Sequence, residues 1–190
     1  MIRLGPAWLT WLATLASCGG APAPQASSPA PATPGDSPLG SATLVTAAET
    51  CSNAADDNQN GLIDEGCGGP VGLVQFISGW SAPKADVDLR VVDPNGELIE
   101  VGRVAKSGLT KDRDCPGRGV ECQGRNLENV YLTEREPVLG EYRVRIRLEA
   151  LGGEPPPIRV TLGARLGQMA RSYELLLDAP ETEREIRLTL

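Results

Sequence analysis

From residue 71 onward, apolar and polar residues alternate along the chain, and this pattern constrains the fold more than any other feature. In the segment Tyr142–Leu148, apolar residues occupy every second position and arginines occupy the positions between them. Successive side chains of a β-strand point to opposite faces, so this segment predicts a strand with one buried face. The segment 86–91 alternates in the same way, with Val87, Leu89 and Val91 on one face.

Turn residues between the alternating segments divide the region into several predicted strands. The sequence Asp93-Pro94-Asn95-Gly96 is a strong turn signal, so we expect a hairpin from 86–91 into Glu97–Val104. Further strands are predicted at 71–80, 127–133, 157–163, 169–178 and 184–190. Short strands, regular turns and no helical stretch predict an all-β fold, a single antiparallel β-sandwich of fibronectin-like or jelly-roll-like type over residues 71–190. The arginines of 142–148 are then expected to lie on a sheet face that contacts only solvent. Alternatively, they form a basic strip that contacts a receptor.

Composition excludes several classes of function. The 190 residues include no histidine, which rules out a Ser-His-Asp triad, a Cys-His pair and any zinc or copper site with histidine ligands. The net charge is −7 and no basic block is present, so a nucleic-acid partner is not expected. A hydrolase that uses only carboxylates, as glycosidases do, remains chemically possible.

The first residues have the layout of a bacterial secretory signal. Arg3 is followed by the apolar run Ala7–Leu15, which is too short to span a bilayer as a helix. The segment Leu15-Ala16-Ser17-Cys18 resembles a lipobox, which implies a signal peptide over 1–17 and lipidation of Cys18. By the same resemblance, Gly19 after the cysteine favours the outer membrane, where the anchor would hold the protein on the periplasmic or the outer surface. An ordinary signal peptide with an incidental cysteine is the alternative.

Residues 18–50 predict a disordered tether. Six prolines between residues 22 and 38 alternate with Ala, Ser, Thr and Gly, and such a segment cannot bury enough apolar surface to order itself. It is expected to act as a semi-extended spacer between the lipid and the folded part.

The remaining cysteines are even in number, which predicts two disulfides in an exported protein. Cys51, Cys67, Cys115 and Cys122 allow three pairings. The pairs Cys51–Cys67 and Cys115–Cys122 are favoured because each closes a small, polar, turn-rich loop. Free thiols or a thiolate metal site are the alternative, which no CxxC motif supports.

The segment 51–67 has the spacing of a calcium-binding loop. Counted from Asp56, oxygen-bearing side chains fall at positions 1, 3, 5 and 9, and Gly61 falls at the sharp turn of position 6. The expected ligands are Asp56, Asn58, Asn60, the carbonyl of Leu62, and Asp64. Position 12, which should carry a bidentate acid, is Cys67, so Glu65 is the expected substitute and the site should be weak. A solvated Asp/Asn turn held only by a disulfide is the alternative.

This cysteine-bracketed Asp/Asn-rich segment resembles the repeats of myxobacterial and related secreted proteins, which are similar to thrombospondin type 3 repeats. The resemblance implies a metal-binding motif. A copper site is disfavoured here because the available ligands are hard oxygens and no imidazole is present.

The strand region also resembles a known family. Trp80, the run 85–91 and Asp93–Glu97 are similar to a signature of YfaP-like domains of unknown function, and Leu127–Val130 and Pro137–Val144 match two of its later elements. The resemblance implies a β-sandwich in an extracellular or periplasmic protein and no known activity. The family's Gly-Pro before Glu-Asn is replaced by Asn126-Leu127, so this turn is expected to differ.

A second group of acids and an amide falls at the ends of the predicted strands. Asp86, Asp88, Glu128 and Asn129 form a possible second calcium site, completed by Asp112 or Asp114 from the long loop 105–126. Capping of strand edges and salt bridges, for instance to Arg90, is the favoured alternative. The loop itself is a candidate contact surface because long loops are often functional.

These observations predict a non-enzymatic, lipid-anchored envelope protein. It would bind calcium weakly and present a β-sandwich to an unknown protein or glycan, in binding or adhesion. A purely structural accessory module of an envelope complex is the second reading. A carboxylate-dependent glycan hydrolase is the third, against which no catalytic motif is present.

Overall fold

The structure, a computed structural model, describes residues 47–117 and 122–190. The predicted signal peptide, the lipidation site Cys18 and most of the predicted tether lie outside the described residues. The described part contains no helix, and so none that is long and apolar enough to cross a membrane.

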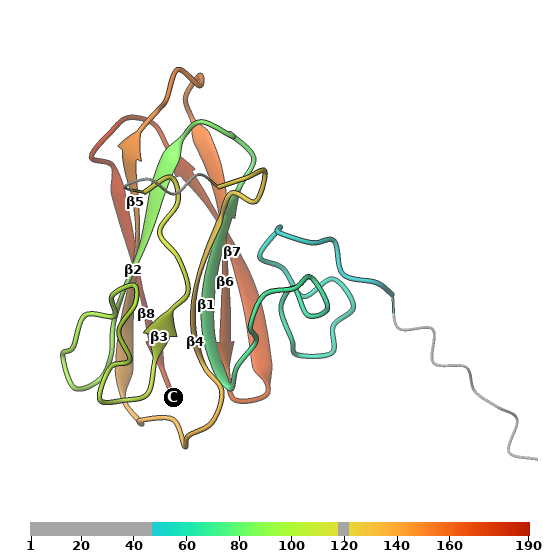
Figure 1. The fold of residues 1–190 in the computed structure, drawn as a ribbon, viewed down its shortest axis with the longest axis vertical. Helices are drawn as coiled ribbons and strands as arrows, with labels where there is room; N and C mark the ends of the chain where they lie inside the picture. The colour runs from blue at the N-terminus through green and yellow to red at the C-terminus, as the bar shows by residue number, and fades with distance from the viewer. Residues whose placement is uncertain (1–46, 118–121) are drawn as a thin grey trace, which may run out of the picture. The chain divides into compact units, whose positions relative to one another are not determined.

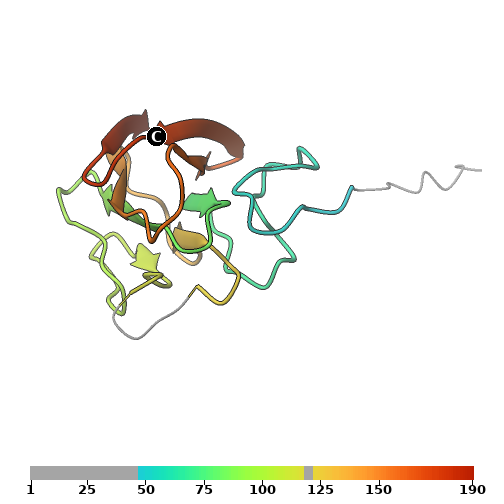
Figure 2. The same cartoon turned by 90° about the horizontal axis from the view of Figure 1, so that it is seen from above.

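Eight strands form two sheets, which Figures 1 and 2 show facing each other. In chain order the strands are β1 (Val74–Trp80), β2 (Asp86–Val92), β3 (Thr110–Lys111), β4 (Leu127–Leu132), β5 (Glu141–Ala150), β6 (Ile158–Leu166), β7 (Met169–Leu177) and β8 (Glu183–Thr189). The larger sheet has the order β3-β4-β1-β6-β7 and the smaller has the order β2-β5-β8. Every pairing between these strands is antiparallel, so the predicted all-β antiparallel sandwich is confirmed.

The core lies between the sheets and follows the predicted alternation. On β5, Tyr142, Val144, Ile146 and Leu148 are at most 1% exposed, and they pack in one cluster with the inward residues of β2. Two of the three arginines between them contact acids: Arg145 lies 2.7 Å from Glu185 of β8, and Arg147 pairs with Glu149 and Glu181. Because most of these arginines have acidic partners, the outer face of the smaller sheet is mainly a network of ion pairs rather than a free basic strip.

The predicted strand at 97–104 does not form. The turn at 93–96 is present, and Ile99 N–H still donates to the carbonyl of Val91, but beyond it only isolated bridges occur. The reason lies at the edge of β2 that does not pair with β5. Further along that edge, the N–H of Leu89 donates to the buried carboxylate of Glu128 at 2.6 Å, so a hairpin partner cannot extend past this point. The short strand β3, which the sequence analysis missed, pairs with β4 instead.

Both predicted disulfides are present, Cys51–Cys67 with Cα atoms 5.4 Å apart and Cys115–Cys122 with Cα atoms 5.0 Å apart. The first closes the segment 51–67, here called the acidic loop. The second brackets residues 118–121, which the structure does not describe.

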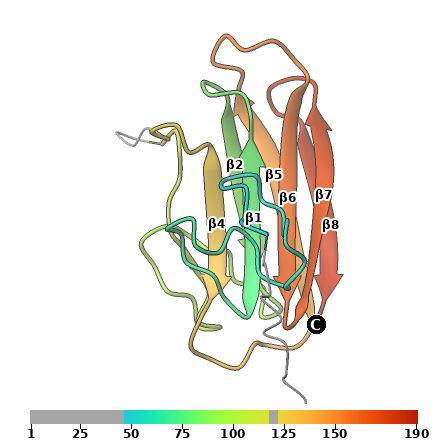
Figure 3. The ribbon, with the colours of Figure 1, turned by 90° about the vertical axis from the view of Figure 1, so that its right-hand side faces the viewer.

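The acidic loop packs directly on the outer face of the larger sheet (Figure 3). Ala54 and Ile63 are fully buried and form a second hydrophobic cluster with Ile77 of β1 and Leu127 of β4. The hydroxyl of Ser172 on β7 donates to the carbonyl of Ala54 at 3.2 Å. As a result all seven residues of β1 are buried, because the core covers one face of the strand and the loop covers the other.

Two glycines allow this close approach. A Cβ atom added to Gly163 on β6 would lie 2.4 Å from the carbonyl oxygen of Ala54, and one added to Gly79 on β1 would lie 2.9 Å from that of Ser52. Any larger residue would therefore push the backbone of the loop off the sheet. Glycine in a strand interior often marks such a contact with another backbone.

The Gly163→Ala variant tests whether the loop docks tightly. We expect it to lower the free energy of unfolding by about 2 kcal/mol, the usual cost of overpacking a closely packed site. Gly69→Ala is the matched control because an added Cβ there meets no atom within 4 Å. Urea denaturation of both variants provides the measurement, and equal midpoints would show that the loop rests loosely on the sheet.

Candidate functional site

Polar side chains hold the acidic loop in a series of tight turns. The two oxygens of Asp56 accept from the N–H groups of Asn60 at 3.0 Å and Gly61 at 2.8 Å. Asn58 Oδ1 accepts from the N–H of Asn60, and Asn60 Oδ1 accepts from the N–H of Leu62. These local bonds explain why the Asp/Asn spacing folds as a compact loop rather than as an extended strand.

Three of the predicted ligands converge on one point. The amide groups of Asn58 and Asn60 both lie 2.6 Å from Glu65 Oε1. Burial raises the pKa of Glu65, but hydrogen bonds from the two amides and from the residue's own backbone together outweigh it, so the pKa lies below its usual range. Its second oxygen, Oε2, is buried and has no hydrogen-bond partner among residues 47–117 and 122–190. A carboxylate and two amides thus meet in one hollow, which is the kind of oxygen-rich set that Ca²⁺ takes.

Glu49 lies in the same hollow, although its position in the sequence falls within the predicted tether. Its carboxylate accepts from the N–H of Asn58 at 3.2 Å and from the N–H of Asp64 at 3.3 Å. The only sequence signal for this role is an acid two residues before Cys51. The hollow is therefore lined in part by a residue that precedes the disulfide-closed segment 51–67.

The structure separates Asp64 from the other expected ligands. Its carboxylate is 5% exposed and accepts from the N–H of Ser52 at 2.9 Å and of Ala54 at 3.1 Å. Burial raises the pKa of Asp64, while these backbone donors oppose that rise. Asp64 joins the two ends of the loop, and Asp56 borders a neighbouring hollow against β7.

Elsewhere in the sandwich, three acids form a second group. One carboxylate oxygen from each of Asp88, Asp114 and Glu128 lies within 4.8 Å of the others, close enough for the triad to hold a metal ion. Asp112 is not part of this triad, and neither is Asn129. Because neighbouring residues of a strand face opposite sides, Asn129 points away from Glu128, and its amide donates to the carbonyl of Pro70 at 2.8 Å.

Lys111 and Arg90 already supply positive charge to this triad. Lys111 Nζ lies 2.8 Å from Glu128 and 3.7 Å from Asp114, and Arg90 lies 2.9 Å from Asp88. Glu128 is fully buried and also accepts from the N–H groups of Leu89 and Cys115. The capping and salt bridges considered from the sequence are therefore present at the triad.

Burial also shifts the titration of these acids. It raises the pKa of Glu128 to about 8, although Lys111 opposes the shift. Burial, together with the charges of Asp88 and Asp114, raises the pKa of Asp86 to about 6. The sequence groups Asp86 with Asp88 and Glu128 as a metal ligand, whereas in the structure the charges of Asp88 and Asp114 act on Asp86 but Asp86 is not part of the triad.

No family model, no curated protein and no solved structure matches the chain. The resemblances to YfaP-like domains and to thrombospondin type 3 repeats therefore rest on the quoted residues alone.

The Glu128 shift predicts a stability that depends on pH. The folded chain keeps the Glu128 proton up to about pH 8, whereas the unfolded chain loses it near the usual value of 4.5. The folded state therefore binds more protons between these values, and stability should fall as the pH rises from 6 to 8, by at most about 1.4 kcal/mol per pH unit for one proton.

Urea denaturation at several pH values measures this slope. No histidine is present to titrate in the same window, and the titration of Asp86, centred near pH 6, contributes only at the lower end of that window. Glu128→Gln should flatten the slope, whereas Glu134→Gln, at an exposed position, should preserve it. A slope unchanged in Glu128→Gln would assign the proton to another group.

Proposed function

We propose that this chain is a non-enzymatic, lipid-anchored envelope protein in which the acidic loop binds Ca²⁺ and supports a β-sandwich that binds a partner. The observation that carries the proposal is the convergence of Asn58, Asn60 and Glu65 in a disulfide-closed loop packed on the larger sheet. The lack of histidine supports a binding role over a catalytic one.

Calcium suits the hollow of the acidic loop for chemical reasons. Its oxygen donors are two carboxylates, Glu49 and Glu65, and two amides, Asn58 and Asn60, all lining one hollow. Rotation of the two amides would turn their oxygens away from the N–H groups of Asn60 and Leu62 toward a bound cation, and would replace the present contacts to Glu65. Two carboxylates and neutral amides favour the weak binding of extracellular calcium modules, with a Kd of about 10⁻⁴–10⁻³ M.

The triad of Asp88, Asp114 and Glu128 is the second candidate for the calcium site. It brings together three carboxyl groups, whereas the hollow of the acidic loop has two. Lys111 counts against it, because an ammonium group 2.8 Å from Glu128 competes for the position a cation would take. We therefore place calcium in the acidic loop.

Calcium titration of the full chain tests this placement. With a Kd of about 0.5 mM, about 5 mM Ca²⁺ should stabilise the folded state by about 1.4 kcal/mol, and EDTA should reverse the effect. Isothermal calorimetry and thermal melts measure the binding and the stabilisation. Glu65→Gln, which keeps the side-chain shape, should abolish both.

Asp114→Asn provides the matched comparison in the triad. If calcium acts at the loop, this variant should bind and respond as the native chain does. Loss of binding in Asp114→Asn with retention in Glu65→Gln would move the site to the triad. An absence of heat and of any melting shift at millimolar calcium would overturn the calcium proposal.

The lipid anchor has a separate test, since Cys18 lies outside the described residues. Cys18→Ser should remove incorporation of labelled palmitate and release the protein from the membrane fraction, because no acyl chain is then attached. Fractionation and labelling in a bacterial host measure both effects. A Cys18→Ser variant that stays in the membrane fraction and still incorporates palmitate would contradict lipidation at this residue.

A further inference from the structure

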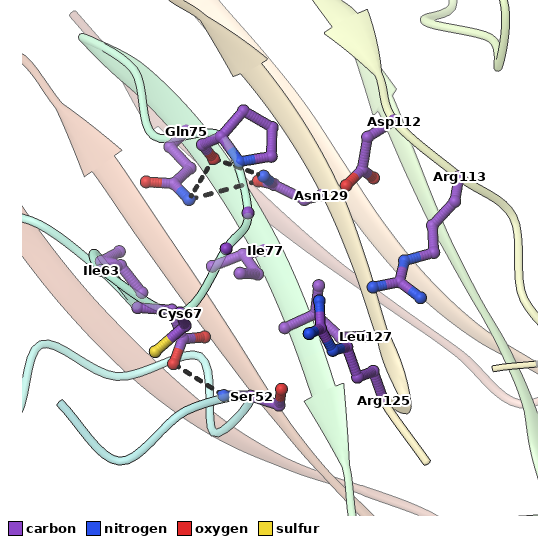
Figure 4. Close-up of a pocket in the computed structure, with 14 residues that line it drawn as sticks. Ser52, Ile63, Cys67, Gln75, Ile77, Asp112, Arg113, Arg125, Leu127 and Asn129 are labelled. Atoms are coloured by element: carbon purple, nitrogen blue, oxygen red, sulfur yellow. Dashed lines mark hydrogen bonds between the residues drawn. The ribbon is translucent and has the colours of Figure 1, made fainter. Parts of the chain in front are cut away.

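The amine of Lys111 and the carboxyl group of Glu128 are held against each other inside the sandwich. Lys111 Nζ lies 2.8 Å from Glu128 Oε2, and the two side chains are 8% and 0% exposed. In Figure 4, Leu127 and Asn129 of β4 both lie on the face that carries the acidic loop, so Glu128 between them points into the interior. The strands β3 and β4 are hydrogen-bonded neighbours, which fixes the position of the pair.

This contact has the geometry that a condensation requires. The carbon atom that an amine would attack, Cδ of Glu128, is bonded to the oxygen that Lys111 already contacts. Two reacting groups that are well oriented at contact distance behave as if their concentration were about 10⁵–10⁸ M. The buried position also excludes bulk water, which would otherwise compete with the amine and reverse the reaction.

Two backbone N–H groups support the carboxyl group of Glu128. The N–H of Leu89 donates to Oε2 at 2.6 Å, and the N–H of Cys115 donates to Oε1 at 3.2 Å. Attack by an amine places negative charge on a carboxyl oxygen, and fixed N–H donors stabilise such a charge. Each oxygen has its own donor, so the oxygen that stays as an amide carbonyl keeps a hydrogen bond.

Asp114 is placed to take up the proton that the lysine must lose before its nitrogen can attack. Asp114 Oδ1 lies 3.7 Å from Lys111 Nζ, and the side chain of Asp114 is 49% exposed, so the proton can pass on to solvent. The state of Glu128 is also suitable. Burial raises the pKa of Glu128 to about 8, so at neutral pH its carboxyl group is mainly protonated and can release water.

We propose that Lys111 and Glu128 form an intramolecular amide bond that cross-links β3 to β4. The ammonium group gives one proton to Asp114, Nζ bonds to Cδ, and one carboxyl oxygen leaves as water. That water carries the proton of the carboxyl group and one hydrogen of the amine, so an ammonium and a neutral carboxyl group become a secondary amide, water and one proton. No oxidant or reductant is needed.

The bond would close a covalent ring around the Cys115–Cys122 disulfide. It requires neither calcium nor the lipid anchor, and it goes beyond the binding role proposed above. An amide does not titrate, so the pH dependence predicted for Glu128 belongs to chains in which the bond has not formed.

Peptide mapping of the full chain by mass spectrometry, after purification in EDTA, tests the bond. Trypsin does not cleave after an acylated lysine, so the bond should join peptide 107–113 to peptide 126–135 with the loss of one water molecule. Without the bond, trypsin cleaves after Lys111 and releases peptides 107–111 and 126–135 separately. Recovery of the separate peptides alone would overturn the proposal.

Two variants show whether Lys111 is the reacting amine. Lys111→Arg keeps a positive charge beside Glu128 but replaces the amine with a guanidinium group, so it should yield only the separate peptides. Lys84→Gln, at an exposed position, is the control and should leave the joined peptide in place. A joined peptide that loses its cross-link equally in both variants would contradict a bond at Lys111.

Refolding tests Asp114 as the proton acceptor. Chains isolated from inclusion bodies in urea have not folded, so the joined peptide should appear only after the urea is removed. Asp114→Asn should slow its appearance by about 100-fold, while urea denaturation shows that the variant folds. Equal rates in the two chains would exclude Asp114 from this role. Because calcium is absent throughout, failure of the amide bond leaves the calcium proposal standing, and the converse also holds.

Discussion

The burial of Ala54 and Ile63 against β1, β4 and β6 is the contact on which the rest of the site depends. It places an irregular, polar segment on a sheet face that would otherwise expose Ile77 and Leu127 to water. The acidic loop thereby becomes part of the sandwich, and its polar side chains gain a fixed support. Both the oxygen-rich hollow on its outer side and a small cavity between it and the larger sheet exist because the loop lies where it does.

Glu128 performs a related task between the two sheets. From β4 of the larger sheet it reaches the N–H of Leu89 on β2 of the smaller sheet, the N–H of Cys115 in the disulfide loop, and Lys111 on β3. Burying a polar group is costly unless it is hydrogen-bonded, and here two N–H groups and an ammonium group surround one carboxyl group. The same contact stops a hairpin from extending along β2, so a single side chain shapes both the sheet edge and the long loop.

Much of the fold could be predicted from the sequence because strand alternation is a local signal. The inward faces of β2 and β5, the turn at 93–96 and the pairing of the cysteines all follow from near neighbours. The prediction of a strand at 97–104 was wrong because Glu128 occupies the edge of β2 with which that strand would pair. Glu128 is 39 residues from its partner Leu89 in the chain, so no local pattern signals the contact. The site was harder to predict for the same reason. The spacing groups Asn58, Asn60 and Glu65, which do lie together, but the contacts of Asp64 and Glu49 depend on how the loop closes on its own backbone.

The Cys51–Cys67 disulfide has a mechanical consequence. Tension applied to the chain on the N-terminal side of Cys51 passes through the covalent bridge to Cys67 and from there along the short connection to β1. The residues between the two cysteines lie outside this line of force. Stretching of the chain ahead of the domain would therefore leave the turns of the acidic loop relaxed, and the load would fall on a central strand that is held on both edges by neighbouring strands.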